Sequence, residues 1–137
     1  MKFLAFPYAG QSSFLSLLRL FLGFLMMTHG AARVYYNSIG NFGQFLESKG
    51  FFQGYLLATG ITIIDLLGGG LLIIGLWVKW ICLWFVLVLT IGIFLVHLPN
   101  GWFVVGHQTG GVEYSLLLII CFLLTASHPK NFTEKIK

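Results

Sequence analysis

The chain has 137 residues, of which 58% are hydrophobic and only 9% charged, with a formal net charge of +4. Soluble domains carry about a quarter charged residues, so this composition, with a mean hydropathy of +0.90, excludes an ordinary water-soluble globule. The charge comes without a basic-aromatic motif, so nothing indicates nucleic-acid binding. The sequence predicts one integral membrane domain over residues 1–137.

Four apolar segments are long enough to cross a bilayer, which takes about 20 helical residues. They cover residues 14–32, 54–78, 80–97 and 111–127. Their patterning lacks the period-2 alternation of membrane barrel strands. We therefore expect an all-α membrane protein, a left-handed bundle of four transmembrane helices.

The first segment resembles a secretory signal, but Arg19 lies inside its apolar stretch, where signal peptides avoid charge. We expect it to be a retained first helix. The connection that follows contains an amphipathic stretch, residues 42–49, which predicts a short helix lying at the membrane interface. Pro99-Asn100-Gly101 marks a turn between the third and fourth segments.

Positive charge indicates the orientation, because lysine and arginine favour the cytoplasmic side. With four crossings, five lysines share the side of the two termini, whereas Arg33 and Lys49 lie on the other side. The sequence thus predicts cytoplasmic N- and C-termini and a location in the bacterial inner membrane. Trp77, Trp80 and Trp84 are expected in the interfacial belt of the cytoplasmic side.

Every predicted helix carries an ionisable side chain at membrane depth, where a charge costs at least about 2.5–3.5 kcal/mol on insertion scales. Such residues persist where they pair inside a bundle or line a cavity. They are Arg19 and His29, Asp65, His97 and Glu113. Arg19 and Asp65 belong to the expected polar core, either as a buried pair that fixes helix register or as part of a polar path.

Spacings of three and four residues place these groups beside small residues, so helices can approach closely there. Thr90 shares the face of His97 on the third helix. The stripes on the first, second and fourth helices are Arg19, Gly23, Met26, Gly30 and Arg33; Ala58, Thr62, Asp65, Gly69, Leu72 and Leu76; and Gly110, Glu113, Leu117, Ile120 and Leu124.

Alternating helix direction brings one polar cluster to the outer mouth of the bundle. Its members are His29, Arg33, His97, His107 and Glu113. Single members have plainer interpretations, such as an interfacial histidine, a loop histidine facing water, or a carboxylate favoured by a helix N-terminus. As a set they suit a ligand.

Three ligand classes stay open for this cluster. Histidine and glutamate bind metals, but the spacing of His97 and His107 matches no known ligand motif. Haem would need His29 and His97 facing each other at one depth. A quinone headgroup needs a donor at a carbonyl oxygen and a group that moves protons, beside an apolar cleft for its tail. Cys82 and Cys121 form no CxxC motif, and we expect both to be small apolar residues.

Short motifs in a fixed order carry a family resemblance. The first helix, RLFLGFLMMTHGAARV, has Arg, Gly, His-Gly and a basic residue in succession, and the second reads DLLGGGLLIIGLWVK from Asp65. The third ends in His97, and GWFVVGHQTGGVEYSLLLI leads through Glu113 and Tyr114 into the fourth. Over about residues 15–124 the chain resembles the DoxX family of small four-helix bacterial membrane proteins. The family more often has Glu at position 65 and Lys at position 33, and both differences keep the charge.

The resemblance implies a link to redox chemistry. Members of the family are regarded as oxidoreductases, one relative is a membrane subunit of a thiosulfate:quinone oxidoreductase, and others are linked to redox-stress complexes. We therefore expect a quinone-binding or quinone-reactive subunit of a membrane oxidoreductase, in which His97 and Glu113 relay protons. The headgroup would contact His29, Arg33, His107 and Tyr114.

Two other functions remain open, and so does the question whether the chain is an enzyme. It would equally suit a non-catalytic scaffold or assembly subunit of a larger cell-envelope complex. A small-molecule transporter is a third hypothesis, although no inverted repeat supports it. Four helices form a thin bundle, so we expect a protein partner or self-association.

Overall fold

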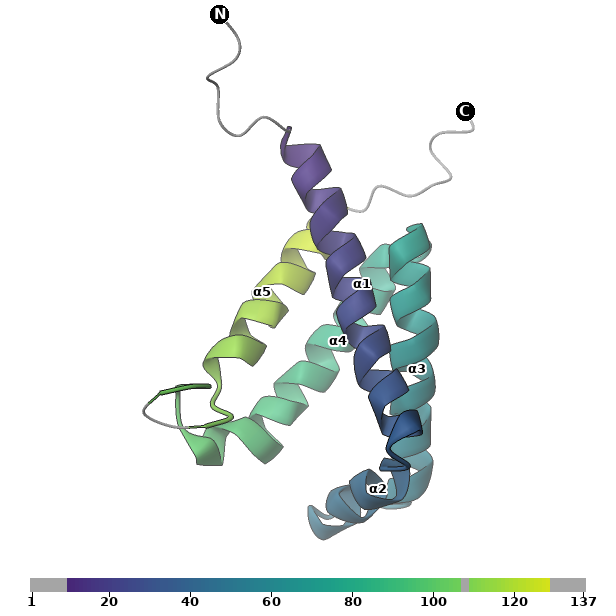
Figure 1. The fold of residues 1–137 in the computed structure, drawn as a ribbon, viewed down its shortest axis with the longest axis vertical. Helices are drawn as coiled ribbons and strands as arrows, with labels where there is room; N and C mark the ends of the chain where they lie inside the picture. The colour runs from purple at the N-terminus through teal and green to yellow at the C-terminus, as the bar shows by residue number, and fades with distance from the viewer. Residues whose placement is uncertain (1–9, 107–108, 129–137) are drawn as a thin grey trace, which may run out of the picture.

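The computed structural model describes residues 10–106 and 109–128, and within them every regular element is helical (Figure 1). These described residues form five α-helices in succession. They are α1 (Gln11–Tyr35), α2 (Ile39–Ser48), α3 (Gly54–Ile74), α4 (Val78–Gly92) and α5 (Glu113–Ser127). After α4 the helix continues as a π-helical turn, Ile93–His97, and a 3₁₀ turn, Leu98–Asn100.

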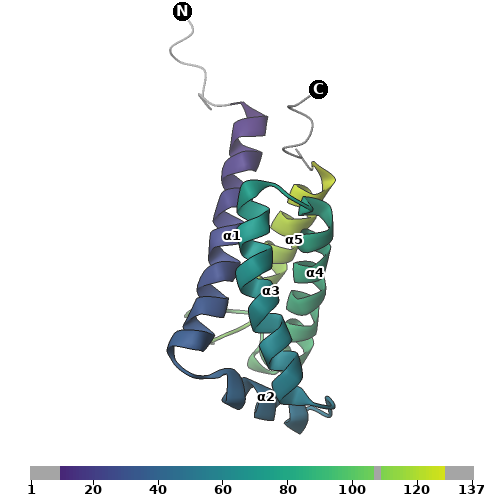
Figure 2. The same cartoon turned by 90° about the vertical axis from the view of Figure 1, so that its right-hand side faces the viewer.

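The helices associate as two pairs. α1 packs along α3, and α4 packs along α5, while contacts between the pairs are few. Figures 1 and 2 show that the start of α1 and the end of α5 lie at one end of the molecule, with α2 crossing the other end. The two pairs diverge toward the end that α2 covers (Figure 1).

Glycines allow the close approach of α1 and α3. A methyl group in place of the Gly23 hydrogen would come within 2.6 Å of the Gly69 carbonyl oxygen, and the reverse substitution would come equally close to Gly23. Gly23 and Gly69 lie on the stripes predicted for their helices. In a membrane, close packing of this kind is a main source of helix association.

The apolar core lies where the two pairs meet. Leu22, Leu72, Phe85 and Phe122 are almost completely buried. The Phe85 and Phe122 rings are 5.2 Å apart in a tilted arrangement, which joins α4 to α5. Cys82 is also fully buried, which agrees with its expected role as a small apolar residue.

The amphipathic stretch predicted at residues 42–49 is α2, which starts three residues earlier. Its Glu47 carboxylate accepts a hydrogen bond of 3.1 Å from the backbone N–H of Gly54, at the first turn of α3. A carboxylate is favoured at this position because a helix N-terminus carries partial positive charge. This contact fixes α2 across the end of α3.

Helix ends differ from the predicted segments by a few residues. α1 is longer at both ends than residues 14–32. α3 stops at Ile74, four residues before the predicted end, because Gly75 is left-handed with φ 81° and the N–H of Leu76 bonds the Leu71 carbonyl. Glycine adopts this conformation without steric cost, and it commonly ends helices.

Three helices are long and apolar enough to cross a membrane, namely Gln11–Tyr35, Gly54–Ile74 and Val78–Asn100. α5 is a shorter apolar helix of 15 residues. The chain is therefore a multi-pass membrane protein, with fewer full-length spans among the described residues than the predicted four.

The stripe predicted for the fourth helix is wrong. Leu117, Ile120 and Leu124 are exposed, whereas Leu118, Phe122 and two polar residues are buried. The helix is rotated so that Ser115 and Thr125 face the bundle. The prediction assumed that the Glu113 carboxylate points into the bundle, but it turns back toward the preceding loop.

Candidate functional site

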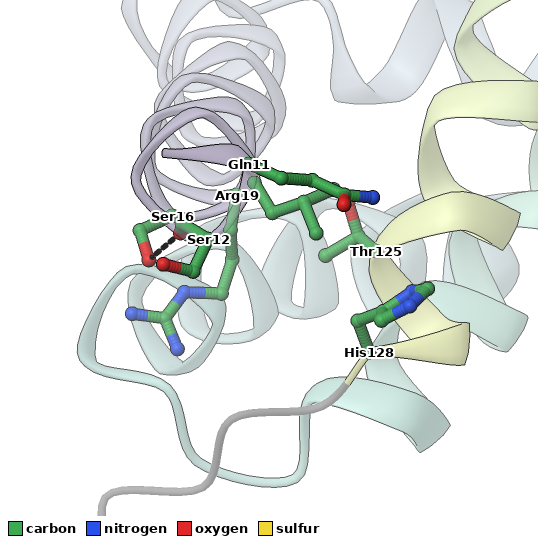
Figure 3. A pocket seen from close by; sticks show the side chains of 7 residues that line it. Gln11, Ser12, Ser16, Arg19, Thr125 and His128 are labelled. Carbon is green, nitrogen blue, oxygen red and sulfur yellow. Dashed lines mark hydrogen bonds between the residues drawn. The ribbon is translucent and has the colours of Figure 1, made fainter. Parts of the chain in front are cut away.

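Arg19 lies at the end of the molecule where α1 begins. A cavity of about 160 Å³ opens there between the first turns of α1 and the last turn of α5, lined by Arg19, Thr125 and His128 among others (Figure 3). The Arg19 guanidinium lies against Gly75, at the turn between α3 and α4. The remaining lining residues are Gln11, Ser12, Leu15 and Ser16.

A larger cavity, of about 410 Å³, lies between the two helix pairs at the end covered by α2. Its walls are mostly apolar and include Phe42 and Phe45 of α2. Leu57, Leu87 and Ile91 line it and are also exposed on the lateral surface, so the cavity is open toward the side of the molecule. The polar or titratable residues in its walls are His29, Arg33, Asp65, Trp84, His97, Tyr114 and Ser115.

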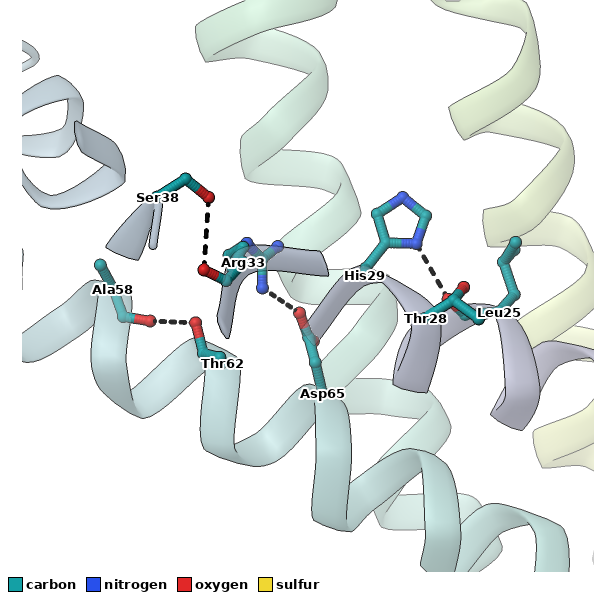
Figure 4. A network of polar contacts seen from close by, with 8 residues as sticks. All are labelled: Leu25, Thr28, His29, Arg33, Ser38, Ala58, Thr62 and Asp65. Carbon is teal, nitrogen blue, oxygen red and sulfur yellow. Dashed lines mark hydrogen bonds and ion pairs between the residues drawn. The ribbon is translucent and has the colours of Figure 1, made fainter. Parts of the chain in front are cut away.

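Asp65 is completely buried and forms an ion pair with Arg33 (Figure 4). Nη1 of Arg33 donates to Oδ2 of Asp65 at 2.5 Å. The Arg33 guanidinium also lies over the Phe42 ring, 5.0 Å from its centre. The pair thus connects α1, α2 and α3 beside the cavity.

Asp65 pairs with Arg33, whereas the sequence left Arg19 and Asp65 as either a buried pair or parts of a polar path. Arg19 contacts Gly75, ten residues beyond Asp65 on α3, which is about 15 Å along the helix at 1.5 Å per residue. Gly30 explains the actual pairing. It packs against the Thr62 carbonyl and the Asp65 side chain, so Arg33, one turn later on α1, reaches the carboxylate.

The two cavity histidines each use one ring nitrogen on a backbone carbonyl. Nδ1 of His29 lies 2.9 Å from the Leu25 oxygen, and Nδ1 of His97 lies 2.7 Å from the Gly110 oxygen. A carbonyl only accepts, so Nδ1 carries the hydrogen in both rings, and Nε2 is an acceptor in the neutral ring. The π-helical turn that ends at His97 is of a type often found at functional sites.

Glu113 fixes the loop between α4 and α5. Its Oε1 accepts a hydrogen bond of 2.8 Å from the Val104 backbone N–H. The backbone N–H groups of Gly110, Gly111, Val112 and Glu113 bond carbonyls in the stretch 101–104, which closes the loop on itself. His97 joins the same network through Gly110. Glu113 is not among the residues that line the cavity. It contacts the loop that holds His97 and does not contact the cavity itself.

Two buried polar atoms in the cavity-lining residues have no hydrogen-bond partner within the described residues. They are Oδ1 of Asp65 and Nε1 of Trp84. Buried polar groups are nearly always paired, so these two atoms need an explanation. Trp84, which is expected in an interfacial belt, is half-buried, and it lines both this cavity and a second hollow beside Trp77 and Trp80. Trp77 and Trp80 are exposed, as an interfacial position requires.

The predicted site residues therefore divide into groups. The structure brings His29, Arg33, His97 and Tyr114 to one cavity, and adds Asp65 to them. His107 lies outside the described residues. The sequence did not identify Trp84, Phe42 and Phe45 as cavity residues. An aromatic side chain among many apolar residues gives no separate signal. Only the amphipathic pattern of α2 indicated that Phe42 and Phe45 share a face.

No cluster of three or more potential metal ligands occurs within residues 10–106 and 109–128. His29 and His97 line the same cavity, but each is fixed through Nδ1 to a carbonyl of its own helix or loop. The cavity therefore offers single acceptors and donors spread over an apolar wall.

Comparison with known proteins gives one match. The model of the family described as DoxX matches residues 14–98, which cover α1 to the 3₁₀ turn after α4. No curated protein and no solved structure matches the chain.

Proposed function

The chain belongs to the DoxX family, and from this premise we propose that it binds a quinone headgroup in the cavity between the two helix pairs, as a subunit of a membrane oxidoreductase in the bacterial inner membrane. The observation that carries the proposal is the cavity itself. It joins an apolar, laterally open volume of about 410 Å³ to a small set of polar groups at one end of the molecule. Ligand sites generally combine apolar walls with a few placed polar groups.

The polar groups fit the chemistry of a quinone. Arg33 has N–H groups beyond the one it gives to Asp65, and a guanidinium presents five in all. These can donate to a carbonyl oxygen, as can Nε1 of Trp84. Aromatic side chains of α2 would contact the ring face, and the lateral opening would let an isoprenoid tail extend into lipid.

His97 is the residue best placed to handle a proton at the headgroup. Its Nδ1 bond to Gly110 holds the ring, which leaves Nε2 to accept. Glu113 is tied to the same loop but does not line the cavity, so its part in a proton path would run through His97.

The membrane arrangement is part of the same proposal. α5 and the preceding loop would form a fourth crossing, with both termini in the cytoplasm. Non-helical backbone at membrane depth is tolerated where its polar groups are satisfied inside the protein. For residues 101–104 and 110–113, the hydrogen bonds between the two stretches, with those of His97 and Glu113, supply that condition.

A steric block tests the proposed site. Gly92 lines the cavity, and a Cβ atom there would meet nothing within 4 Å, so Gly92→Leu should fill space without disturbing the helix. We expect this variant, in lipid nanodiscs, to lose at least about tenfold in affinity for a short-chain quinone measured by calorimetry. Gly70→Leu is the matched control, because Gly70 also has open space and does not line the cavity.

Equal affinities of both leucine variants and the unaltered protein would contradict the site. Purification from native membranes, with mass spectrometry of extracted lipids, would show whether a quinone accompanies the protein. A protein that carries no quinone, binds none, and co-purifies with a stoichiometric partner would favour the scaffold function instead.

A further inference from the structure

We infer that the cavity holds the reduced, dihydroxy form of its ligand in preference to the oxidised dicarbonyl form. This inference rests on the proposed function, since it names the redox state of the same headgroup. It follows from three acceptor atoms of the cavity residues, which only a hydroxyl can satisfy, because the remaining N–H groups of Arg33 can donate to the oxygen of either form.

Three side-chain atoms of the cavity residues can accept a hydrogen bond from a ligand. The Nδ1 bonds of His29 and His97 to carbonyl oxygens fix the tautomer, so each neutral ring offers Nε2 as an acceptor. Figure 4 shows the second nitrogen of His29 turned away from the helix that carries it. Oδ1 of Asp65 is a third acceptor, on a completely buried residue, and it has no partner within the described residues.

A carbonyl oxygen cannot satisfy any of these three acceptors, because it has no hydrogen to donate. A hydroxyl donates to them and can also accept from Nε1 of Trp84, which is the buried donor without a partner. The oxidised headgroup would therefore leave Asp65 Oδ1 unsatisfied, and the reduced headgroup need not.

Asp65 Oδ1 is covered by the wall in this conformation, whereas the two histidine nitrogens are not among the buried atoms without a partner. Side chains commonly change rotamer when a ligand enters, and the inference requires such a change to bring Oδ1 to a ligand hydroxyl. The ion pair with Arg33 uses Oδ2, and Oδ1 remains the atom to be satisfied.

Sites that hydrogen-bond a ligand hydroxyl discriminate strongly against analogues that lack it. We therefore expect the quinol to bind at least about tenfold more tightly than the quinone with the same ring and tail. The third probe is the dimethyl ether of the quinol, which keeps the substituents and has no O–H. It should bind no better than the quinone.

The experiment measures the three dissociation constants anaerobically, for the full-length protein in lipid nanodiscs. Equal binding of quinol and quinone would overturn the inference and leave the proposed function standing. Tight binding of the dimethyl ether would also overturn it, because shape would then explain the preference. Failure of all three probes to bind would overturn the proposed function as well.

Two substitutions test whether the cavity histidines cause the preference for the quinol. His97→Asn and His29→Asn each keep an N–H near the position of Nδ1 and remove the Nε2 acceptor. The ratio of quinone to quinol dissociation constants should fall by at least about threefold in one or both. His128→Asn, in an exposed residue outside this cavity, is the control and should leave the ratio unchanged. Unchanged ratios in both cavity variants would contradict the role of the histidines.

Discussion

Arg33 and Asp65 differ in their access to solvent, and this difference predicts unequal effects when either is removed. The Asp65 side chain is 1% exposed and that of Arg33 is 22% exposed. Arg33→Ala leaves a buried carboxylate without its counter-charge, which typically costs about 3–5 kcal/mol. Asp65→Ala leaves a guanidinium that still reaches the surface, so we expect a smaller loss of stability.

Thermal unfolding in detergent, followed by circular dichroism at helix wavelengths, measures the effect of each substitution on stability. Lys49→Ala, in an exposed residue, serves as the control. If Asp65→Ala proved the more destabilising change, the unpaired buried carboxylate would not be the main cause of the lost stability.

Glu113 allows a structural role to be separated from a chemical one. Glu113→Gln keeps an oxygen that can accept from the Val104 N–H, whereas Glu113→Ala removes it. We expect hydrogen exchange at Val104 to accelerate by about tenfold or more in the alanine variant and to stay near its original rate in the glutamine variant. Loss of the proposed redox activity in the glutamine variant, with exchange unchanged, would instead indicate that the carboxylate moves protons.

The ionisable residues were the most informative part of the sequence. Which of them pair with one another was the hardest feature to predict. The expense of charge at membrane depth identified Arg19, His29, Asp65, His97 and Glu113 as residues with a role. Of these, His29, Asp65 and His97 line one cavity, together with Arg33 of the predicted outer cluster, whereas Arg19 and Glu113 do not line it. The choice of Arg33 over Arg19 depends on the packing of Gly30 against Asp65. Such a contact depends on the relative positions of two helices, which spacing along one helix cannot provide.

At the level of the helices, neighbouring glycines in α3 predict opposite outcomes. A Cβ atom on Gly69 would come within 2.6 Å of the Gly23 carbonyl oxygen, whereas one on Gly70 would meet nothing within 4 Å. Gly69→Ala must push α1 away and should destabilise the protein by about 1–3 kcal/mol. Gly70→Ala should be neutral or stabilising by up to about 1 kcal/mol, because alanine favours the helix.

Thermal unfolding of the two alanine variants under the same conditions gives the comparison. Similar unfolding temperatures would mean that α1 and α3 are not in close contact at Gly69. Gly70→Ala is the control for Gly69→Ala, because the two positions are adjacent and lie on different faces of α3.

Helix existence was predictable, and helix ends and orientation were less so. Burial of Gly23, Met26 and Gly30 supports the stripe on α1, and burial of Asp65 and Gly69 supports the stripe on α3. Leu76, the last residue predicted for the second stripe, lies beyond the end of α3 and is exposed. α5 has little amphipathic contrast, because both of its faces are apolar. Its buried face is set by Phe122 packing on Phe85, a tertiary contact without a local signature.

At the scale of the whole molecule, the number of crossings decides where the C-terminus lies. α5 has 15 residues and is the only α-helix after α4 in the described part of the chain, so its crossing is the proposal to test. We expect a fluorescent protein fused after Lys137 to fluoresce in the cytoplasm. Alkaline phosphatase fused after Lys49 or Val105 should be active, because both sites would face outward. A C-terminal fusion with the opposite sidedness would contradict four crossings.

The division of the helices into two pairs also implies an order of assembly during synthesis. α1, α2 and α3 make most of their contacts among themselves, so they can associate as soon as α3 has entered the membrane. At about 5–20 residues per second, the ribosome needs several more seconds to complete α4 and α5. During that interval the Arg33–Asp65 pair can already form, while the side of the cavity built by His97 and Tyr114 does not yet exist. The nascent first half is therefore the stage at which a chaperone or insertion factor would meet an open, half-built site.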